Sequence, residues 1–400
     1  MRNLAASSLL ATIFGQIAVA MAIMTVPVLA PQISREVNVD ASRIGLYSAI
    51  VFIGAITFTS IAGSMIARYG SVRTTQLALF ISGSGLLLSL MPTIPSLIVG
   101  AFATGMGYGV ATPAASNLLA RTVSPKHRGL IFSIKQSGVP IGGFILGLMV
   151  PGIAYSFGWA VGVLSVALIL FTLSIILQPI RRYFDTDLDK NRKISPAETF
   201  AAVRLVYSDS RLRPLALSSF IYAMMQLSVF TYFVVLLVEK VGFSSVVAGS
   251  IFSVMHLGGT IGRPLLGWVS DQLLPARPLL SLVGFLIFFC SLALASLNES
   301  WSYPAILVLS AVTGIITAGW NGVYISEIAR VVTPSEIGRA TGGVSAFTFL
   351  GVAIGPALFS GVLEISSSYS IAFLILGTVA LGPAIILLIT KNTSKYKDIE

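Results

Sequence analysis

Twelve stretches of mostly apolar residues, each long enough to cross a bilayer as a helix, dominate this sequence of 400 residues. A spanning helix needs roughly 20 such residues. The stretches cover residues 8–31, 42–66, 74–92, 96–120, 129–153, 156–178, 213–237, 244–270, 278–298, 302–326, 340–363 and 369–390. Only 10% of the residues are charged, whereas soluble domains carry about a quarter. The sequence therefore predicts an all-α membrane protein with twelve transmembrane helices.

A polar stretch separates six of these runs from the other six. We therefore expect an N-terminal six-helix bundle over residues 1–178, a central loop over 179–212 and a C-terminal six-helix bundle over 213–400. The charged run RRYFDTDLDKNRK in the loop is typical of a solvated linker. The next segment, SPAETFAAVRLVYSDS, predicts a short amphipathic helix on the cytoplasmic face, because Ser195 and Glu198 form a capping box with Pro196 between them.

The basic residues are distributed unevenly, and this distribution predicts the topology. If both termini are cytoplasmic, 20 of the 25 Lys and Arg residues lie on the cytoplasmic side, and only Arg35, Arg43 and Lys240 lie outside. The formal net charge of +10 then reflects attraction to membrane phosphates, and no nucleic-acid partner is expected. We expect a multi-pass, monomeric protein of the cytoplasmic (inner) membrane with the lipid bilayer as its surroundings.

Two sequence patterns recur at matching places in the two halves. GSMIARYGSVRT follows the second run and GWVSDQLLPARP follows the eighth, while A-R-x-V-[ST]-P begins at Ala120 after the fourth run and at Ala329 after the tenth. Such repeats indicate two pseudo-symmetric bundles with a solute site between them near the middle of the membrane. With these motifs, the chain resembles the major facilitator superfamily over essentially its whole length.

That resemblance implies a role in gating for the first pattern. The loop of the family reads G-x-x-x-D-R-x-G-[RK]-x-x-[RK], and its residues link helix ends and help to stabilise one face of an alternating-access cycle. In the first copy the acidic position is occupied by Ala67. The candidate gating residues are Gly63, Arg68, Gly70 and Arg73 in the first copy and Gly267, Asp271 and Arg277 in the second.

Ionisable residues inside the predicted spans are few: Lys135, Arg263 and His256, with no acidic residue well inside a span. Such residues are costly in a membrane and usually functional. From the helical rise, Lys135 lies about 10 Å and Arg263 about 12 Å from the cytoplasmic ends of their helices. The family resemblance places spans five and eight beside each other across the interface between the halves, so we expect both cations to face one cavity.

The segment GRPLLG (262–267) is similar to the eighth span of the monocarboxylate and oxalate transporters, in which the Arg before the Pro binds the substrate carboxylate. We therefore expect a secondary transporter of a small organic anion, such as a mono- or dicarboxylate, that binds to Arg263 and Lys135. Neutral polar residues of the spans are further candidates for substrate contact. They are Gln16, Tyr108, Asn117, Gln136, Tyr222, Gln226, Trp320, Asn321 and Tyr324.

Other interpretations of these residues stay open. Lys135 is close enough to a helix end to snorkel to the interface, Arg263 fits the role of a cap on a neighbouring helix terminus, and His256 fits either a proton-coupling residue or a packing residue. The alternative function is a proton-coupled exporter of drugs or other hydrophobic compounds. The sequence contains no nucleotide-binding loop, metal cluster or catalytic triad, so we expect no enzyme activity, no cofactor and no metal.

Overall fold

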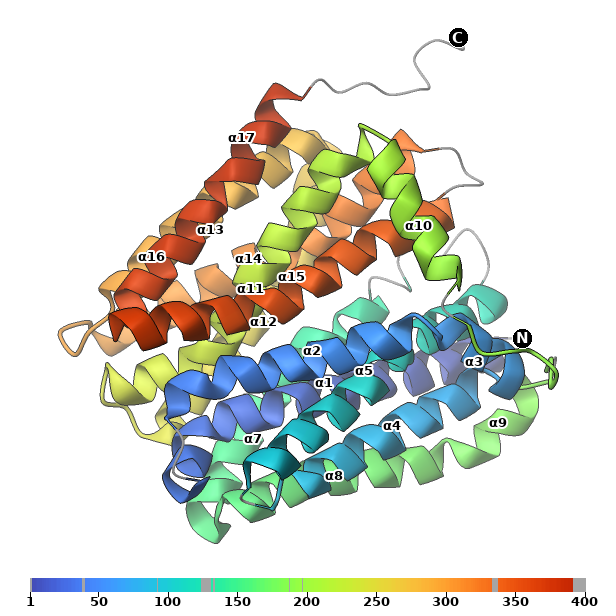
Figure 1. Cartoon of the computed structure of the whole chain (residues 1–400), viewed down its shortest axis with the longest axis horizontal. Helices are drawn as coiled ribbons and strands as arrows, with labels where there is room; N and C mark the ends of the chain where they lie inside the picture. The colour runs from blue at the N-terminus through green and yellow to red at the C-terminus, as the bar shows by residue number, and fades with distance from the viewer. Residues whose placement is uncertain are drawn as a thin grey trace. The chain divides into compact units, whose positions relative to one another are not determined.

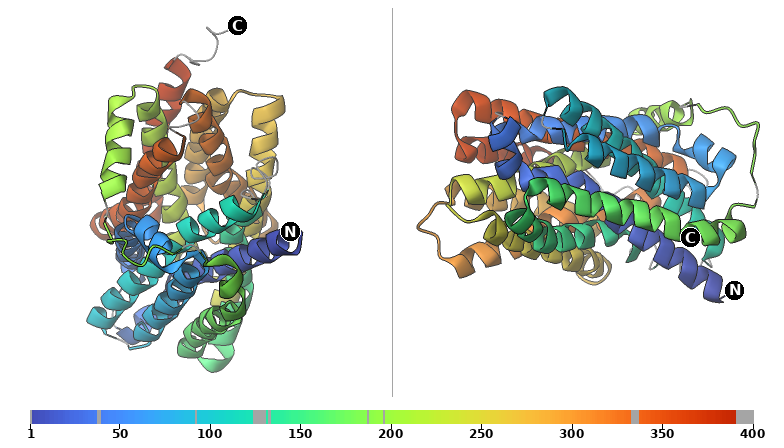
Figure 2. Two further views of the ribbon diagram at one scale, coloured as in Figure 1. Left: turned by 90° about the vertical axis from the view of Figure 1, so that its right-hand side faces the viewer. Right: turned by 90° about the horizontal axis from the view of Figure 1, so that it is seen from below.

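The structure is a computed structural model, and it describes residues 2–37, 40–91, 93–123, 131, 134–186, 188–195, 197–332 and 337–390. Within these residues every regular element is a helix (Figure 1, Figure 2). The first half contains α1 (Arg2–Val37), the 3₁₀ turn η1 (Ala41–Arg43), α2 (Ile44–Thr59), α3 (Ala62–Tyr69), α4 (Ser71–Leu88), α5 (Ile94–Thr122), α7 (Gly138–Phe157), α8 (Trp159–Ile176) and α9 (Gln178–Phe184). The second half contains α10 (Ala197–Ser208), α11 (Leu212–Glu239), α12 (Ser245–Gln272), α13 (Ala276–Ser296), α14 (Tyr303–Val331), α15 (Ile337–Ser366), α16 (Tyr369–Val379) and α17 (Leu381–Ile389).

Eleven helical stretches in the described residues are long and apolar enough to cross a membrane, and they coincide with eleven of the twelve predicted runs. The remaining run, 74–92, corresponds to α4, a helix of 18 residues whose first turns contain polar side chains from Ser71 to Gln76. The helix packs against α5 and α8, which surround its polar end with protein. The predicted all-α fold of twelve membrane helices is thereby confirmed.

Within the described residues, three predicted spans are interrupted, and for 42–66 and 369–390 local hydrogen bonding explains the interruption. Between α2 and α3, the Ser60 hydroxyl donates to the Thr57 carbonyl and the Thr57 hydroxyl donates to the Ile53 carbonyl, which are contacts that bend helices. Between α16 and α17, Pro383 has no N–H group to donate to the carbonyl of Val379. The amide of Ala380 therefore bonds to Gly377 in a tighter turn.

The chain divides into two compact units, which we describe separately. The first contains residues 1–196 and 233–253, and the second contains residues 197–232 and 254–400. The division crosses α11 between Tyr232 and Phe233 and crosses α12 between Ser253 and Val254. The domain boundaries predicted at the central loop stay a prediction.

Glycines allow the closest helix crossings, and these crossings repeat in both units. In the first unit, a Cβ on Gly105 of α5 would lie 1.7 Å from the Val51 carbonyl oxygen of α2. In the second unit, a Cβ on Gly314 of α14 would lie 1.8 Å from the Met255 carbonyl oxygen of α12. Small residues commonly permit such close backbone approach between membrane helices.

A second pair of crossings repeats in the same way. A Cβ on Gly142 of α7 would lie 2.7 Å from the Ile17 carbonyl oxygen of α1, and one on Gly351 of α15 would lie 1.9 Å from the Phe220 carbonyl oxygen of α11. Gly142 and Gly351 have the same separation along the chain as Gly105 and Gly314. Ala120 and Ala329, which begin the repeated sequence pattern, share that separation too. The internal repeat seen in the sequence therefore corresponds to a repeat in helix packing.

The central loop contacts the first unit at several points. Its first basic residues belong to α9, and the side chain of Asp185 after α9 is 1% exposed. The backbone of Asp189 donates to the Ala67 carbonyl, and the Ser64 hydroxyl bonds to the backbone of Ser195. Residues 189–195 are nevertheless exposed, so the solvated linker stays a prediction, to which the structure adds contacts with the ends of α3 and α4.

The helix predicted after this run is present as α10 (Ala197–Ser208), and it packs against α15. A Cβ on Gly343 of α15 would lie 2.3 Å from the Ala202 carbonyl oxygen, so the two helices are in close contact. Pro196 and the side chain of Glu198 lie outside the described residues, as do the last two residues of each copy of the repeated A-R-x-V-[ST]-P pattern.

Candidate functional site

Lys135 lies in the first unit, just before α7, and its side chain is 0% exposed. Its Nζ atom donates a hydrogen bond to Oε1 of the neighbouring Gln136 at 3.0 Å. A snorkelling lysine would leave its amine at the membrane interface, and this burial disagrees with that interpretation. The structure therefore places a cation among the protein side chains of this unit.

The helix that carries Lys135 is interrupted at Ser137, and Pro140 accounts for the interruption. Pro140 has no N–H group that could reach the carbonyl of residue 136, and the Ser137 amide bonds to Ile134 three residues earlier. Pro140 lies in the first turn of α7. Interrupted helices often line the solute sites of transporters.

Gln16 of α1 faces this segment. Its Oε1 accepts a hydrogen bond from the Thr112 hydroxyl of α5 at 3.1 Å. On the other side, a Cβ on Gly138 would lie 3.1 Å from the Gln16 Cβ and 3.2 Å from its Cγ. Polar side chains of α1 and α5 therefore lie close together next to the start of α7 in the first unit.

In the second unit, Arg263 of α12 is partly buried, and its Nε donates to the Ala318 carbonyl of α14 at 3.3 Å. The amide nitrogen of Asn321 lies 3.4 Å from the same carbonyl oxygen. Ala318 is in the interior of α14, so this contact differs from a cap on a helix terminus. The contact holds the Arg263 side chain against α14 next to Asn321.

Aromatic side chains of α11 and α14 pack together in the interior of the second unit. Trp320 makes edge contacts with Tyr222 at 5.9 Å and with Tyr324 at 5.4 Å between ring centroids. The Tyr222 hydroxyl donates to the Leu280 carbonyl at 2.8 Å, and the Trp320 indole N–H donates to the Thr317 carbonyl at 3.0 Å. Tyr222 is 0% and Trp320 is 1% exposed, so both rings pack among the helices with their polar atoms turned to backbone.

The remaining predicted residues occupy varied surroundings. Gln226 and Tyr108 are partly exposed, and the Tyr108 ring contacts Phe52 edge-on at 5.7 Å. His256 is fully buried, with its ring 4.4 Å from that of Phe230 between centroids. This contact fits a packing role as well as a coupling role.

Lys135 and Arg263 belong to different units, and each is described within its own unit. Their meeting in one cavity therefore stays a prediction, as do the roles of the other candidate substrate contacts.

In the first copy of the candidate gating pattern, Asp185 binds the start of α4, a contact that sequence reasoning missed. Gly70 has φ of +89° and begins α4. The Asp185 carboxylate accepts the backbone N–H groups of Val72 and Arg73 at 3.0 and 2.9 Å. An acidic group at a helix N-terminus satisfies unpaired N–H groups and the helix dipole. Asp185 thus provides a carboxylate at the N-terminus of α4, whereas the acidic position of the motif is occupied by Ala67.

The side chains of the other residues in this pattern make weaker contacts. Arg68 is exposed and lies over the Tyr69 ring at 5.5 Å, and the Arg73 guanidinium reaches Gln76 at 3.4 Å. Gly63 is exposed within α3. The Asp185 contacts could not be found from the motif alone, because that residue lies far along the chain in a segment that reads as a linker.

In the second unit, Arg277 makes a buried ion pair that sequence reasoning also missed. Its Nε lies 2.8 Å from a carboxylate oxygen of Glu327 in α14, and the two side chains are 3% and 0% exposed. Arg330, 40% exposed, donates to both oxygens of Glu327, at 2.7 and 2.8 Å. Asp271 is exposed, and a Cβ on Gly267 would meet no neighbour. In the second copy of the pattern, the buried ion pair is therefore made by Arg277.

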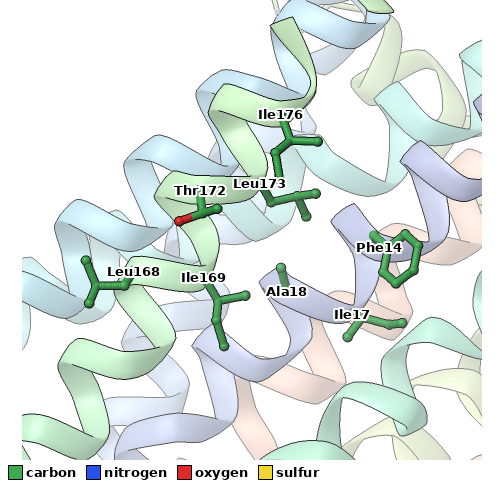
Figure 3. Close-up of a pocket in the computed structure, with 8 residues that line it drawn as sticks. All are labelled: Phe14, Ile17, Ala18, Leu168, Ile169, Thr172, Leu173 and Ile176. Carbon is green, nitrogen blue, oxygen red and sulfur yellow. The ribbon is translucent and has the colours of Figure 1, made fainter.

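An apolar groove lies between α1 and α8 in the first unit (Figure 3). Its volume is about 360 Å³, and Thr172 supplies the one hydroxyl among its lining side chains. The other lining residues are Phe14, Ile17, Ala18, Leu168, Ile169, Leu173 and Ile176. Such a lining offers nothing to neutralise an anion, and it does not include Lys135.

Comparison with known proteins places these features in a family context. The model of the Major Facilitator Superfamily matches residues 12–326. The hexuronate transporter of Bacillus subtilis (strain 168) is 23% identical over 368 residues, covering 88% of this chain and 86% of that protein. The 3-(3-hydroxy-phenyl)propionate transporter of Escherichia coli (strain K12) is 27% identical over 349 residues, covering 84% and 81%.

The fold is also similar to that of solved transporters. The crystal structure of a POT family transporter in complex with 5-aminolevulinic acid superposes with a TM-score of 0.75 at 14% sequence identity. The superposition covers 97% of this chain and 96% of that chain. At this identity the similarity concerns the fold alone.

Proposed function

The chain belongs to the major facilitator superfamily, and we propose that it is a secondary transporter that moves a small organic anion across the cytoplasmic membrane by alternating access. The two relatives described above are transporters named for acids, a hexuronate and a phenylpropionate. Both substrates carry a carboxylate on a compact organic body. A mono- or dicarboxylate of this size is the cargo that we propose.

The observation that carries the proposal is the buried lysine of the first unit. Lys135 is 0% exposed, and its amine donates to an uncharged amide of Gln136. Bringing an ammonium group out of water costs several kcal/mol in rough terms, which a bound carboxylate would offset by pairing with it. A carboxylate bound beside Lys135 would therefore lower the free-energy cost of burying the ammonium group.

Arg263 supplies the second cation of the proposal. Its Nε donates to the Ala318 carbonyl at 3.3 Å, so α14 orients the planar guanidinium group. A guanidinium pairs with a carboxylate through two parallel hydrogen bonds. We propose that Arg263 binds the anion from the second unit during the transport cycle.

The energy source is a separate part of the proposal. With no acidic residue well inside a predicted span, an acidic proton relay has no sequence support. His256 is the candidate for proton coupling, and exchange of one anion for another is the alternative. Both termini are proposed to be cytoplasmic, because that orientation puts most basic residues inside.

Uptake by the purified protein in liposomes tests the function. Radiolabelled glucuronate, 3-(3-hydroxyphenyl)propionate and succinate are offered to the wild-type protein and to Arg263→Ala and Lys135→Gln variants. Each variant should raise KM at least about tenfold, since hydrogen bonds to charged groups contribute about 1.5–3 kcal/mol. Arg35→Ala, at an exposed position near the end of α1, is the control and should transport normally.

Two results would contradict this function. Unchanged KM in both variants would refute the assigned binding residues. Transport of hydrophobic cations in place of the three anions would favour the exporter alternative and refute the organic-anion proposal.

A further inference from the structure

Gln16 has a buried donor that the fold does not use. The side chain is 2% exposed on α1, and its Oε1 accepts from the Thr112 hydroxyl at 3.1 Å. With the amide oriented by that bond, Nε2 is buried and has no hydrogen-bond partner among the described residues. Buried amide donors are almost always paired, and each exception calls for an explanation.

The position of Gln16 supplies that explanation. Gly138, three residues after Lys135, packs directly on the Gln16 side chain, at 3.1 Å from an ideal Cβ to the Gln16 Cβ. Only the turn at Ser137 separates the helical segment that carries Lys135 from α7. Lys135 and Gln16 therefore share the region where α1 and the start of α7 meet, and these two helices are in contact.

Glycine at position 138 is what allows this approach. A larger side chain there would press on the Cβ and Cγ of Gln16 and push its amide away from α7. The Thr112 hydroxyl holds the amide from the opposite side, on α5. The side chain is thus fixed between two helices with its NH₂ group left over.

We propose that Gln16 is a substrate-binding residue, and that its Nε2 and the ammonium group of Lys135 together bind the two oxygens of one carboxylate. The inference rests on the proposed function and deepens it by assigning the carboxylate end of the substrate to the first unit. A neutral donor adds a hydrogen bond to the anion without placing a second positive charge beside Lys135. The site selects a planar anion with two acceptor oxygens.

Gln16→Leu removes the donor and keeps a side chain of similar size. Uptake of glucuronate, 3-(3-hydroxyphenyl)propionate and succinate by proteoliposomes should show KM raised about tenfold or more for each transported anion, with Vmax changed less, because an uncompensated charged hydrogen bond is lost. Gln32→Leu is the matched control. It makes the same change at a partly exposed position of the same helix, and its KM should stay at the wild-type value.

Gln16→Glu provides a test that does not depend on tolerance of an apolar side chain. The new carboxylate has the shape of the amide and would pair with Lys135 in place of the substrate. We expect this variant to unfold at or above the wild-type temperature and to lose the thermal stabilisation that the transported anion gives the wild-type protein. A merely structural role for Gln16 predicts the reverse: a lower unfolding temperature with the anion effect retained.

The outcomes separate this inference from the function on which it rests. If Lys135→Gln raises KM and Gln16→Leu does not, or if Gln16→Glu still responds to the anion, the role of Gln16 is refuted and the anion carrier stands. If the wild-type protein neither transports nor is stabilised by any of the three anions, both proposals are refuted.

Discussion

The ion pair between Arg277 and Glu327 offers the sharpest test of how the second unit is held together. Glu327→Gln keeps the shape of the side chain and removes its charge. Among the described residues, the guanidinium of Arg277, 3% exposed, would then have only neutral acceptors: the new amide oxygen at position 327, the Thr390 hydroxyl at 3.4 Å and the Arg211 carbonyl at 3.3 Å. The variant therefore leaves a buried cation without a counter-ion.

The expected loss follows from this burial. Removing one partner of a buried ion pair costs about 3–5 kcal/mol, because the other charge stays desolvated. The contact of Glu327 with Arg330 adds little to that sum, since Arg330 is 40% exposed and surface pairs contribute about 0–1 kcal/mol. With about 2–4 °C of Tm per kcal/mol in a unit of this size, Tm should fall by on the order of 10 °C.

The chain contains its own reporter for the measurement. Cys290 is the single cysteine, and it is 7% exposed in α13. A fluorogenic maleimide will therefore label the detergent-solubilised protein when the second unit unfolds. Arg330→Gln is the control and should shift Tm by no more than a few degrees.

A double variant completes the test. Replacing Arg277 by Met in the Glu327→Gln background removes the stranded charge and should recover part of the lost stability. The reasoning is refuted if Glu327→Gln lowers Tm no more than Arg330→Gln does, or if the double variant is less stable than Glu327→Gln alone.

Three further predictions concern packing and helix ends. Gly314→Ala should destabilise the protein by about 1–3 kcal/mol or more, because the new Cβ would lie 1.8 Å from the Met255 carbonyl oxygen. Gly322→Ala in the same helix meets no neighbour and should be neutral or slightly stabilising. Equal Tm values for the two variants would contradict this packing. Asp185→Ala should cost about 1–2 kcal/mol through the loss of the α4 cap, measured by thermal melting of the helical circular-dichroism signal, and an unchanged Tm would show that water replaces the cap. Hydrogen bonds from Ser42 lower the pKa of the Asp40 carboxyl. The stabilisation that Asp40 gives the folded state should therefore be present at neutral pH and disappear as the pH falls below about 4 through that lowered pKa. Asp40→Asn should flatten the dependence of stability on pH in this range, and an unchanged pH dependence would contradict the assignment.

The fold could be predicted because its main signal is local. Each apolar run is long enough to span a bilayer by itself, and the hydrogen bonds of a helix are satisfied within the run. Even α4, whose polar first turns weaken that signal, was found because the rest of the run is apolar. The interruptions were not predicted at their observed places, because they depend on individual bonds near Ser60, Ser137 and Ala380.

The candidate site could be predicted only in part. Lys135 was found because a cation in an apolar run is conspicuous, and its full burial is the property that the structure added. Gln16 was one of several neutral polar residues in the spans. Its unused donor became visible only when Thr112 and Gly138 were placed on either side of it.

By itself, the sequence determined the helical membrane fold, the internal repeat and the scarcity of charge within the spans. Those properties follow from composition and period, which act over neighbouring residues. Only the tertiary structure decided which charges are paired and which helix ends are capped. Asp185 reaches α4 and Glu327 reaches Arg277 across long separations in the chain, and no local pattern encodes such contacts, because they exist only once the helices have packed.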